Sequence, residues 1–195
     1  MDYDLLVIGS GPGGYVAAIR ASQLNMKVAV VERAELGGIC LNWGCIPTKS
    51  LLKSAQVFEY LNHASDYGIT IEGSAKPDFS AIISRSRTVA EGMSKGIQFL
   101  FKKNNIEHIQ GIARLVSGSR VDVTGNDGKV TGVSAKNIIL ATGARSRELP
   151  ELKQDGKRVF GYREAMTLEN QPASMIVVGS GAIGIEFASF YRDLG

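Results

Sequence analysis

The chain has 195 residues, of which 44% are hydrophobic, 21% charged and 7% aromatic. This composition is typical of a globular protein and excludes intrinsic disorder as its main state. The formal net charge is only +3, so it gives no support for a nucleic-acid or membrane partner. Glycine is frequent, with 23 residues, and its clusters beside apolar runs predict tight turns and close approach of the backbone to a ligand.

The first elements along the chain are predicted to form a βαβ unit. Residues 5–8 are a short apolar run typical of a buried parallel strand, residues 9–14 a glycine turn and residues 15–24 a helix. A second buried strand follows at residues 28–31 and ends on Glu32. Because two strands joined by a crossover helix run in parallel, the sheet is expected to begin as a parallel sheet.

The middle of the chain is predicted to change from helices to strands. Residues 37–45 are expected to be irregular and rich in glycine, and Pro47 suits the first turn of a helix that continues over residues 48–62. A long helix is expected over residues 79–103. Short apolar runs between turn residues then predict a three-stranded antiparallel meander and one further buried strand, at residues 115–116, 121–123, 130–133 and 138–140.

The last part of the chain repeats the order of the first unit. Residues 148–172 are polar and are expected to form a connection. A buried strand is predicted at residues 175–178, a glycine turn at 179–184 and a helix at 185–194.

The turn GSGPGG at residues 9–14 fits the pattern G-x-G-x-x-G. It follows a predicted strand, precedes a predicted helix and lies about 20 residues ahead of an acidic residue, Glu32, which is the context of a dinucleotide-binding turn. Gly9 allows the tight turn, Gly11 lets the backbone approach a pyrophosphate, and Gly14 allows the helix to pack closely on the strand.

The turn GSGAIG at residues 179–184 is a second copy of this pattern and predicts a second dinucleotide site. Its acidic residue is expected about 20 residues further on, beyond Gly195. These residues therefore do not separate NAD from NADP.

The only two cysteines are Cys40 and Cys45. Two thiols without a nearby histidine are too few for a zinc site, so no metal is expected, and a single close pair is not a secreted disulfide scaffold. Cys45 precedes Pro47 at a predicted helix start, where the helix dipole stabilises a thiolate. Two buried structural thiols are the alternative, but the surrounding glycines and the upstream dinucleotide turn favour a redox pair.

The N-terminus gives no targeting signal. Two acidic residues, Asp2 and Asp4, stand before the first apolar run, where a signal peptide carries basic residues. No apolar run approaches the ~20 residues that span a bilayer. A cytoplasmic location is therefore expected.

Residues 37–49, GGICLNWGCIPTK, resemble the redox-disulfide signature of the flavin-dependent pyridine nucleotide–disulfide oxidoreductases. The resemblance runs from Asp4 to the last residue. It implies an α/β, Rossmann-like fold that binds FAD and NAD(P), with a parallel sheet, helices and a three-stranded antiparallel meander. The implied domains are the N-terminal portion of an FAD-binding domain (1–147), a connection (148–172) and the truncated start of a second, NAD-binding Rossmann-like domain (173–195).

The resemblance also implies the residues of the site. Cys45 is implied to be the thiolate beside the flavin and Cys40 the thiol that exchanges disulfides with the substrate. Lys49 and Glu186, which are unremarkable by themselves, match an ion pair near flavin N5. The other residues implied to bind FAD are Gly9, Gly11, Pro12, Gly13, Gly14, Glu32, Gly38, Gly111, Ala113, Ala141, Thr142 and Gly143, and those implied to bind NAD are Gly179, Gly181 and Gly184.

Two stretches of the signature, Leu41-Asn42-Trp43 and Pro47-Thr48-Lys49, are similar to the bacterial members that oxidise protein-bound dihydrolipoamide with NAD. Those members are the shared flavoprotein component of the 2-oxo acid dehydrogenase complexes. The implied partners are the lipoyl-bearing acyltransferase subunit of such a complex and a second copy of the chain, with no nucleic acid and no membrane. Glutathione reductase and mercuric reductase share the cysteine signature and remain alternatives.

The family's histidine–glutamate base near the C-terminus has no match among the two histidines, His63 and His108. His63 is expected at the surface between helices, and His108 is expected to be structural. The chain is accordingly expected to be an N-terminal fragment of the enzyme, which by itself is an inactive FAD-binding module.

Overall fold

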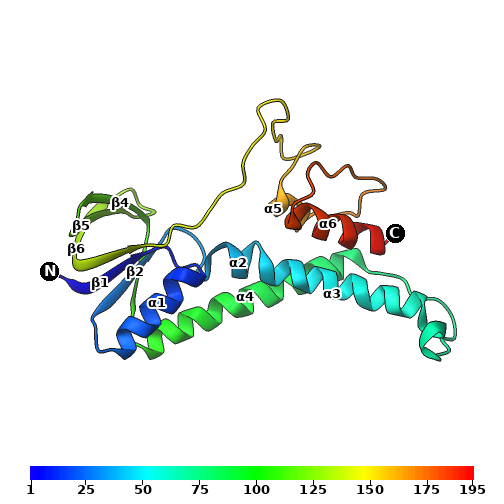
Figure 1. Ribbon diagram of the computed structural model, residues 1–195, viewed down its shortest axis with the longest axis horizontal. Coiled ribbons are helices and arrows are strands. Elements are labelled where there is room, and N and C mark those ends of the chain that lie inside the picture. Colours follow the sequence, from blue (N-terminus) through cyan, green and yellow to red (C-terminus); the bar gives the residue numbers. More distant parts are fainter. The chain divides into compact units, whose positions relative to one another are not determined.

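The computed structural model describes residues 1–195 and divides them into two compact units. Unit 1 contains residues 1–42 and 91–145, and unit 2 contains residues 43–90 and 146–195. Each unit has its own hydrophobic core. Figure 1 labels most of the helices and strands along the chain.

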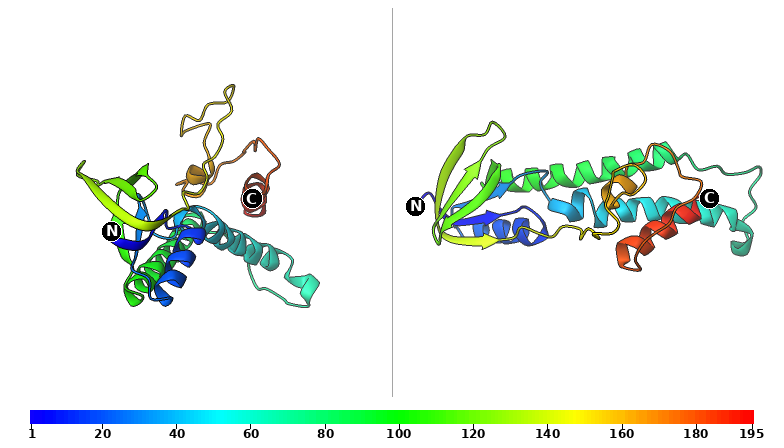
Figure 2. Two further views of the ribbon diagram at one scale, coloured as in Figure 1. Left: turned by 60° about the vertical axis from the view of Figure 1, so that its left-hand side comes forward. Right: turned by 90° about the horizontal axis from the view of Figure 1, so that it is seen from above.

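Unit 1 is built on a six-stranded mixed sheet with the order β3-β2-β1-β6-β5-β4. Its parallel part joins β1 to β2 and β6, and β2 to β3. Its antiparallel part joins β5 to β4 and to the first half of β6, drawn in green to yellow in Figure 2. The prediction of a parallel sheet followed by an antiparallel meander is therefore confirmed. The strands are β1 (Tyr3–Ile8), β2 (Val28–Glu32), β3 (Glu107–Gln110), β4 (Ile112–Ser117), β5 (Arg120–Thr124) and β6 (Val130–Leu140).

The strand β6 belongs to both parts of the sheet, and this corrects the prediction of two separate strands at residues 130–133 and 138–140. Residues 130–134 pair antiparallel with β5, and residues from Ala135 onward pair parallel with β1. The polar residues between the two apolar runs obscured this continuity. Leu140 is 61% exposed rather than buried.

The helices of unit 1 are α1 (Pro12–Gln23), α2 (Gly38–Asn42) and the C-terminal part of α4 (Phe79–Lys103). Two residues beyond the last residue of α1 and of α4 stands an asparagine with positive φ, Asn25 at 63° and Asn105 at 51°. In each case the next amide donates back to the helix, from Met26 to Ala21 and from Ile106 to Phe101. Asparagine tolerates this left-handed conformation, so each helix stops just before the strand that follows it.

Three helices begin earlier than the sequence predicted, one of them α6 (Ala182–Asp193), whose start was expected at residue 185. The helix α1 begins at Pro12 rather than at residue 15, because glycine and proline are tolerated where the first amides need no intrahelical partner. For the same reason α3 begins at Cys45, two residues ahead of Pro47. The short helix α2 replaces part of the irregular segment expected at residues 37–45. His108, expected to be structural, lies within β3.

Unit 2 is helical. It contains α3 (Cys45–Asn62), the 3-10 helix η1 (Ala64–Tyr67), α5 (Tyr162–Ala165), α6 (Ala182–Asp193) and the N-terminal part of α4. Its core joins α3 and α6 through Leu51, Phe187 and Phe190. The buried Tyr191 hydroxyl donates to the carbonyl of Ala165 at 2.5 Å, and burial raises the pKa of Tyr191 to about 12. None of the helices has the length and apolar character that a membrane span requires.

The prediction of a buried strand at residues 175–178 is wrong. These residues are irregular, and the side chains of Ile176 and Val178 are 91% and 63% exposed. A strand is stable only when neighbouring strands accept its backbone hydrogen bonds, and no strand pairs with these residues. The glycine turn and the helix after it form nonetheless.

Candidate functional site

The first glycine turn joins the end of β1 to the start of α1. Gly9 has a φ of +101°, and a Cβ there would lie 2.2 Å from the carbonyl oxygen of Ala141. A Cβ on Gly14 would lie 1.9 Å from the carbonyl oxygen of Gly9. A Cβ on Gly11, by contrast, would meet no heavy atom within 4 Å. Backbone packing therefore requires glycine at positions 9 and 14, whereas Gly11 leaves open space before α1.

This open space fits the pyrophosphate of a dinucleotide. Gly11 is the N-cap residue of α1 and makes no side-chain cap, Pro12 follows it, and Gly13 is exposed with open space around it. The first turn of a helix presents amides without intrahelical partners and the positive end of the helix dipole. Both attract a phosphate group, and glycine lets it approach the backbone closely.

The acidic residue expected after the turn, Glu32, ends β2 and is buried. Its Oε2 accepts hydrogen bonds from the amide and the hydroxyl of Ser10, at 2.9 and 2.7 Å. Its Oε1 accepts from the amides of Arg33 and Ala34, at 2.8 and 3.0 Å. Burial by itself raises the pKa of Glu32, but these hydrogen bonds outweigh it and hold the pKa below the ordinary value of 4.5. The side chain is thus an oriented carboxylate.

The other residues expected around FAD gather at the same edge of the sheet. Gly111 follows β3, and its amide donates to the carbonyl of Glu32 at 2.9 Å. Ala141 follows β6, and its amide donates to the carbonyl of Ile8 at 2.8 Å. The structure brings these residues together because the carboxyl ends of parallel strands share one edge, where α/β sheets bind their ligands. Ala113 is half-buried in β4, and Thr142 and Gly143 are exposed beyond β6.

The cysteine segment begins against the glycine turn. Gly37 and Gly38 both have positive φ, and a Cβ on Gly38 would lie 2.7 Å from the Cα of Gly11. The buried amide of Asn42 donates to the carbonyls of Leu36 and Gly38, each at 2.9 Å, and so ties this loop to α2. Cys40 lies in α2 and is half-buried.

The second cysteine starts α3. Cys45 is its first residue and is exposed, and Lys49 lies one turn further along the helix. The Nζ of Lys49 forms an ion pair with Oε1 of Glu186 on α6, and the two side chains are 62% and 29% exposed. The structure thus brings together two residues far apart in the sequence, while their place beside a flavin stays a prediction.

The second glycine turn has the backbone of the first. Gly181 is the N-cap of α6 with φ −69° and ψ 164°, close to the −65° and −178° of Gly11. A Cβ on Gly184 would lie 2.7 Å from the carbonyl oxygen of Gly179, whereas a Cβ on Gly179 or Gly181 would meet no heavy atom within 4 Å. The turn has the shape for a phosphate, although no paired strand precedes it.

Sequence reasoning missed several contacts made by residues that neighbour the predicted site residues. Ser10 holds Glu32, yet the spacing between them gives no sign of this contact, which the pairing of β1 with β2 creates. Trp43, between the cysteines, has the guanidinium groups of Arg87 and Arg163 at 4.5 and 5.0 Å from its ring centroid. Two cationic side chains therefore flank Trp43, the residue that follows α2 in the chain.

Neither of the two histidines is among the residues predicted for the site, and both are exposed. His63 is exposed between α3 and η1, and its Nδ1 lies 3.1 Å from Oε1 of Glu59. His108 lies on β3 with its side chain largely exposed; the protein around the rest of the ring partly desolvates it, which lowers the pKa of His108, and the charge of Glu32 acts in the opposite direction.

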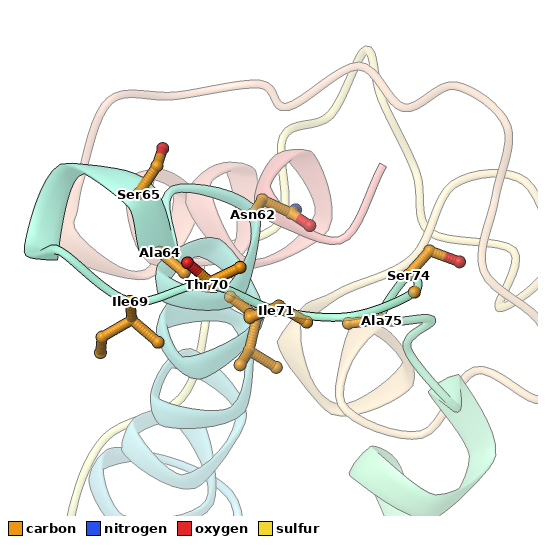
Figure 3. Close-up of a pocket in the computed structure, with 10 residues that line it drawn as sticks. Asn62, Ala64, Ser65, Ile69, Thr70, Ile71, Ser74 and Ala75 are labelled. Atoms are coloured by element: carbon orange, nitrogen blue, oxygen red, sulfur yellow. The ribbon is translucent and has the colours of Figure 1, made fainter.

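A pocket of about 440 Å³ lies in unit 2, between the end of α3 and the loop that follows η1 (Figure 3). It is lined by Leu61, Asn62, Ala64, Ser65, Ile69, Thr70, Ile71, Gly73, Ser74 and Ala75. None of these is a cysteine or a titratable residue, and none was expected in the site. The pocket therefore offers no groups for redox chemistry.

Comparisons with family models, curated proteins and solved structures all match the same family over nearly the whole chain. Residues 3–195 match the family model of the pyridine nucleotide-disulphide oxidoreductases. A dihydrolipoyl dehydrogenase of Rhizobium etli is 53% identical over 99% of this chain and 43% of its own length, and one of Bacillus subtilis is 41% identical over 100% and 42%. The crystal structure of LpdA from Mycobacterium tuberculosis superposes with a TM-score of 0.86 at 29% identity, covering 97% of this chain and 42% of that one.

The chain thus spans about two fifths of the length of these relatives, with 43% of the Rhizobium etli protein covered. The match extends over almost the whole chain and includes both glycine turns and both cysteines. The chain belongs to the pyridine nucleotide-disulphide oxidoreductase family, whose members use a flavin and a pyridine nucleotide.

Proposed function

We propose that this chain supplies the FAD-binding part and the redox cysteines of an enzyme that oxidises protein-bound dihydrolipoamide to lipoamide with NAD. The observation that carries the proposal is the contact between Gly38 and Gly11. It means that the segment bearing Cys40 starts directly at the turn that fits a pyrophosphate. A dinucleotide cofactor and a reactive cysteine in one segment are what a flavin-dependent disulfide oxidoreductase needs.

The proposed FAD site follows from the edge of the sheet in unit 1. Amides at the start of α1 bind the pyrophosphate, and the carboxylate of Glu32 accepts hydrogen bonds from the adenosine ribose. Gly111 and Ala113 form the surface for the adenine, and residues 141–143 pack on the cofactor. The glycines at 179, 181 and 184 bind the NAD pyrophosphate in the same way.

The cysteines carry the exchange with the substrate. A substrate thiolate attacks the sulfur of Cys40, the Cys40–Cys45 bond breaks, and Cys45 leaves as a thiolate. The second thiolate of the substrate then attacks the substrate sulfur that is bonded to Cys40, and Cys40 leaves as a thiolate. The substrate is thereby oxidised to its disulfide, and the cysteine pair is reduced. When bound, the flavin supplies the two-electron redox chemistry that connects the cysteines to NAD. Lys49, one turn along α3 from Cys45, is held in position by Glu186.

The proposed domains are an FAD-binding portion at residues 1–147, a connection at 148–172 and the start of an NAD-binding domain at 173–195. The proposed partners are the lipoyl-bearing acyltransferase subunit of a 2-oxo acid dehydrogenase complex and a second copy of the protein, in the cytoplasm. The dihydrolipoyl dehydrogenases among the relatives support this choice.

The test has a binding part and a turnover part. The purified protein is expected to hold FAD with a visible flavin spectrum, and Gly11→Ala is expected to lose it. The longer polypeptide that carries this chain is expected to reduce NAD with dihydrolipoamide, and Cys45→Ser is expected to abolish this rate. Turnover with glutathione disulfide or mercuric ion and none with dihydrolipoamide would instead assign the chain to another branch of the family.

A second candidate function is that of an FAD-binding module without turnover, for the 195-residue chain by itself. The unpaired residues 175–178 favour it, because the second glycine turn then lacks the strand that holds it in a sheet. The chain is expected to bind FAD and to give a negligible rate with dihydrolipoamide and NAD. A robust steady-state rate from this chain would exclude the module.

A further inference from the structure

One fully buried residue connects the three parts of the proposed FAD site. Ser10 is 0% exposed, and its hydroxyl donates to Oε2 of Glu32 at 2.7 Å. The amide of Gly37 donates both to this hydroxyl, at 3.2 Å, and to the carbonyl of Ser10, at 3.1 Å. Ser10 thus lies within the glycine turn and contacts the acidic end of β2 and the loop that leads to Cys40.

We propose that Ser10 is a positioning residue, whose hydroxyl orients the Glu32 carboxylate toward the ribose hydroxyls of a bound adenine dinucleotide. The inference rests on the proposed function, because it concerns how the FAD site discriminates its ligand. It assigns the ribose selectivity of this chain to a residue that does not touch the ligand.

The orientation of the carboxylate depends on both of its oxygens. Oε1 is held by two amides of its own turn, those of Arg33 and Ala34. Oε2 is held only through Ser10, and the hydroxyl makes the shorter of its two bonds. The terminal torsion of a glutamate is soft, so removing the hydroxyl lets the carboxylate turn away from the geometry that two neighbouring ribose hydroxyls require.

The contact is expected to persist when a ligand is bound. The bonds of Oε2 to Ser10 are buried, whereas those of Oε1 to the amides of Arg33 and Ala34 are only partly buried, so a ligand arriving from solvent meets the carboxylate on its Oε1 side and does not reach the Ser10 hydroxyl. A ligand that displaced the hydroxyl would leave a buried donor without a partner, which is costly. The ribose therefore binds beside the Ser10 contact and does not replace it.

The substitution Ser10→Ala is compatible with folding. The amide of Gly37 keeps the carbonyl of residue 10 as its acceptor, and Glu32 keeps the amide of residue 10 as a donor. The matched control is Ser86→Ala on α4, since Ser86 is also 0% exposed but its hydroxyl donates to Ile83 in its own helix.

The experiment measures the dissociation constants of FAD and of its 2′-deoxyadenosine analogue for the wild type, Ser10→Ala and Ser86→Ala, by quenching of flavin fluorescence. The wild type is expected to prefer FAD to the analogue. Ser10→Ala is expected to weaken FAD binding about tenfold, the order of one hydrogen bond to a charged acceptor, and to change the analogue far less. Ser86→Ala is expected to leave both constants unchanged.

Equal weakening of both ligands by Ser10→Ala, or no weakening of either, would overturn the inference, because the hydroxyl would then act on the fold or not at all. If Ser10→Ala does not fold, Ser10→Thr serves as the second variant, because it retains the hydroxyl and is expected to keep the preference for FAD over the 2′-deoxyadenosine analogue. A Ser10→Thr protein that binds FAD without this preference would also overturn the inference. A wild-type protein that binds neither ligand would instead refute the proposed function.

Discussion

Replacing two glycines of the first turn, one at a time, separates the packing role of the motif from its binding role. Gly14→Ala is expected to destabilise unit 1, because its Cβ would lie 1.9 Å from the carbonyl oxygen of Gly9. Gly11→Ala is expected to leave stability unchanged, because its Cβ meets no heavy atom within 4 Å and its φ of −65° suits alanine. Only Gly11→Ala is expected to weaken FAD binding in a folded protein.

The magnitude follows from the contact at Gly14. Ordinary contacts to a Cβ are 3.4 Å or longer, so α1 must move away from β1 to relieve a contact of 1.9 Å. The carbonyl oxygen belongs to the backbone and the position of the Cβ is fixed by the backbone, so no side-chain rotation can help. Overpacking of this kind costs about 3 kcal/mol. Gly13→Ala is the matched control, since its Cβ is unobstructed in the same helix, where alanine is favoured over glycine by about 1 kcal/mol.

The assay is urea denaturation followed by far-ultraviolet circular dichroism, with FAD binding measured separately by quenching of flavin fluorescence. Gly13→Ala is expected to be the most stable of the four proteins and Gly14→Ala the least stable. The wild type and Gly11→Ala are expected to lie between them with equal stability. The reasoning would be refuted if Gly11→Ala were destabilised as much as Gly14→Ala, or if Gly11→Ala bound FAD as tightly as the wild type.

Three further predictions concern unit 2 and the cysteines. Because the pKa of Tyr191 is raised from 10.0 to about 12, the unfolded chain loses this proton first as the pH rises, so unit 2 is fully stable below pH 10 and loses stability between 10 and 12. Fluorescence of the only tryptophan reports this loss, and Tyr191→Phe should flatten the dependence; an unchanged slope would contradict it. The exposed Lys49–Glu186 pair should couple by less than about 1 kcal/mol in a double-mutant cycle of unfolding, while Lys49→Met lowers turnover of the complete enzyme. A large stability coupling with normal turnover would refute the proposed role. In the reduced protein without FAD, exposed Cys45 should react with iodoacetamide before half-buried Cys40. Added FAD should slow the reaction of Cys45 but not that of Cys40. Equal labelling of Cys45 with and without FAD would count against a flavin beside Cys45.

Patterns set by neighbouring residues were predicted well. The long helix α4 has the bounds expected from its periodicity, and β2 ends on the acidic residue that the glycine turn requires. The short helix α2 escaped prediction because five residues are too few to show a helical period. The strand expected at residues 175–178 failed because an apolar run becomes a strand only when another strand pairs with it.

The sequence by itself determined the motifs of this protein: two glycine turns, an acidic residue at the end of the second strand, and a cysteine pair whose surroundings are typical of one family. The tertiary structure decided which side chains lie around these motifs. Ser10 holds Glu32 because β1 and β2 pair in one register, and Gly38 lies against Gly11 because a backbone with positive φ turns the cysteine loop back toward the glycine turn. Contacts between residues far apart in the chain depend on strand pairing and helix packing, which no local pattern of residue types records.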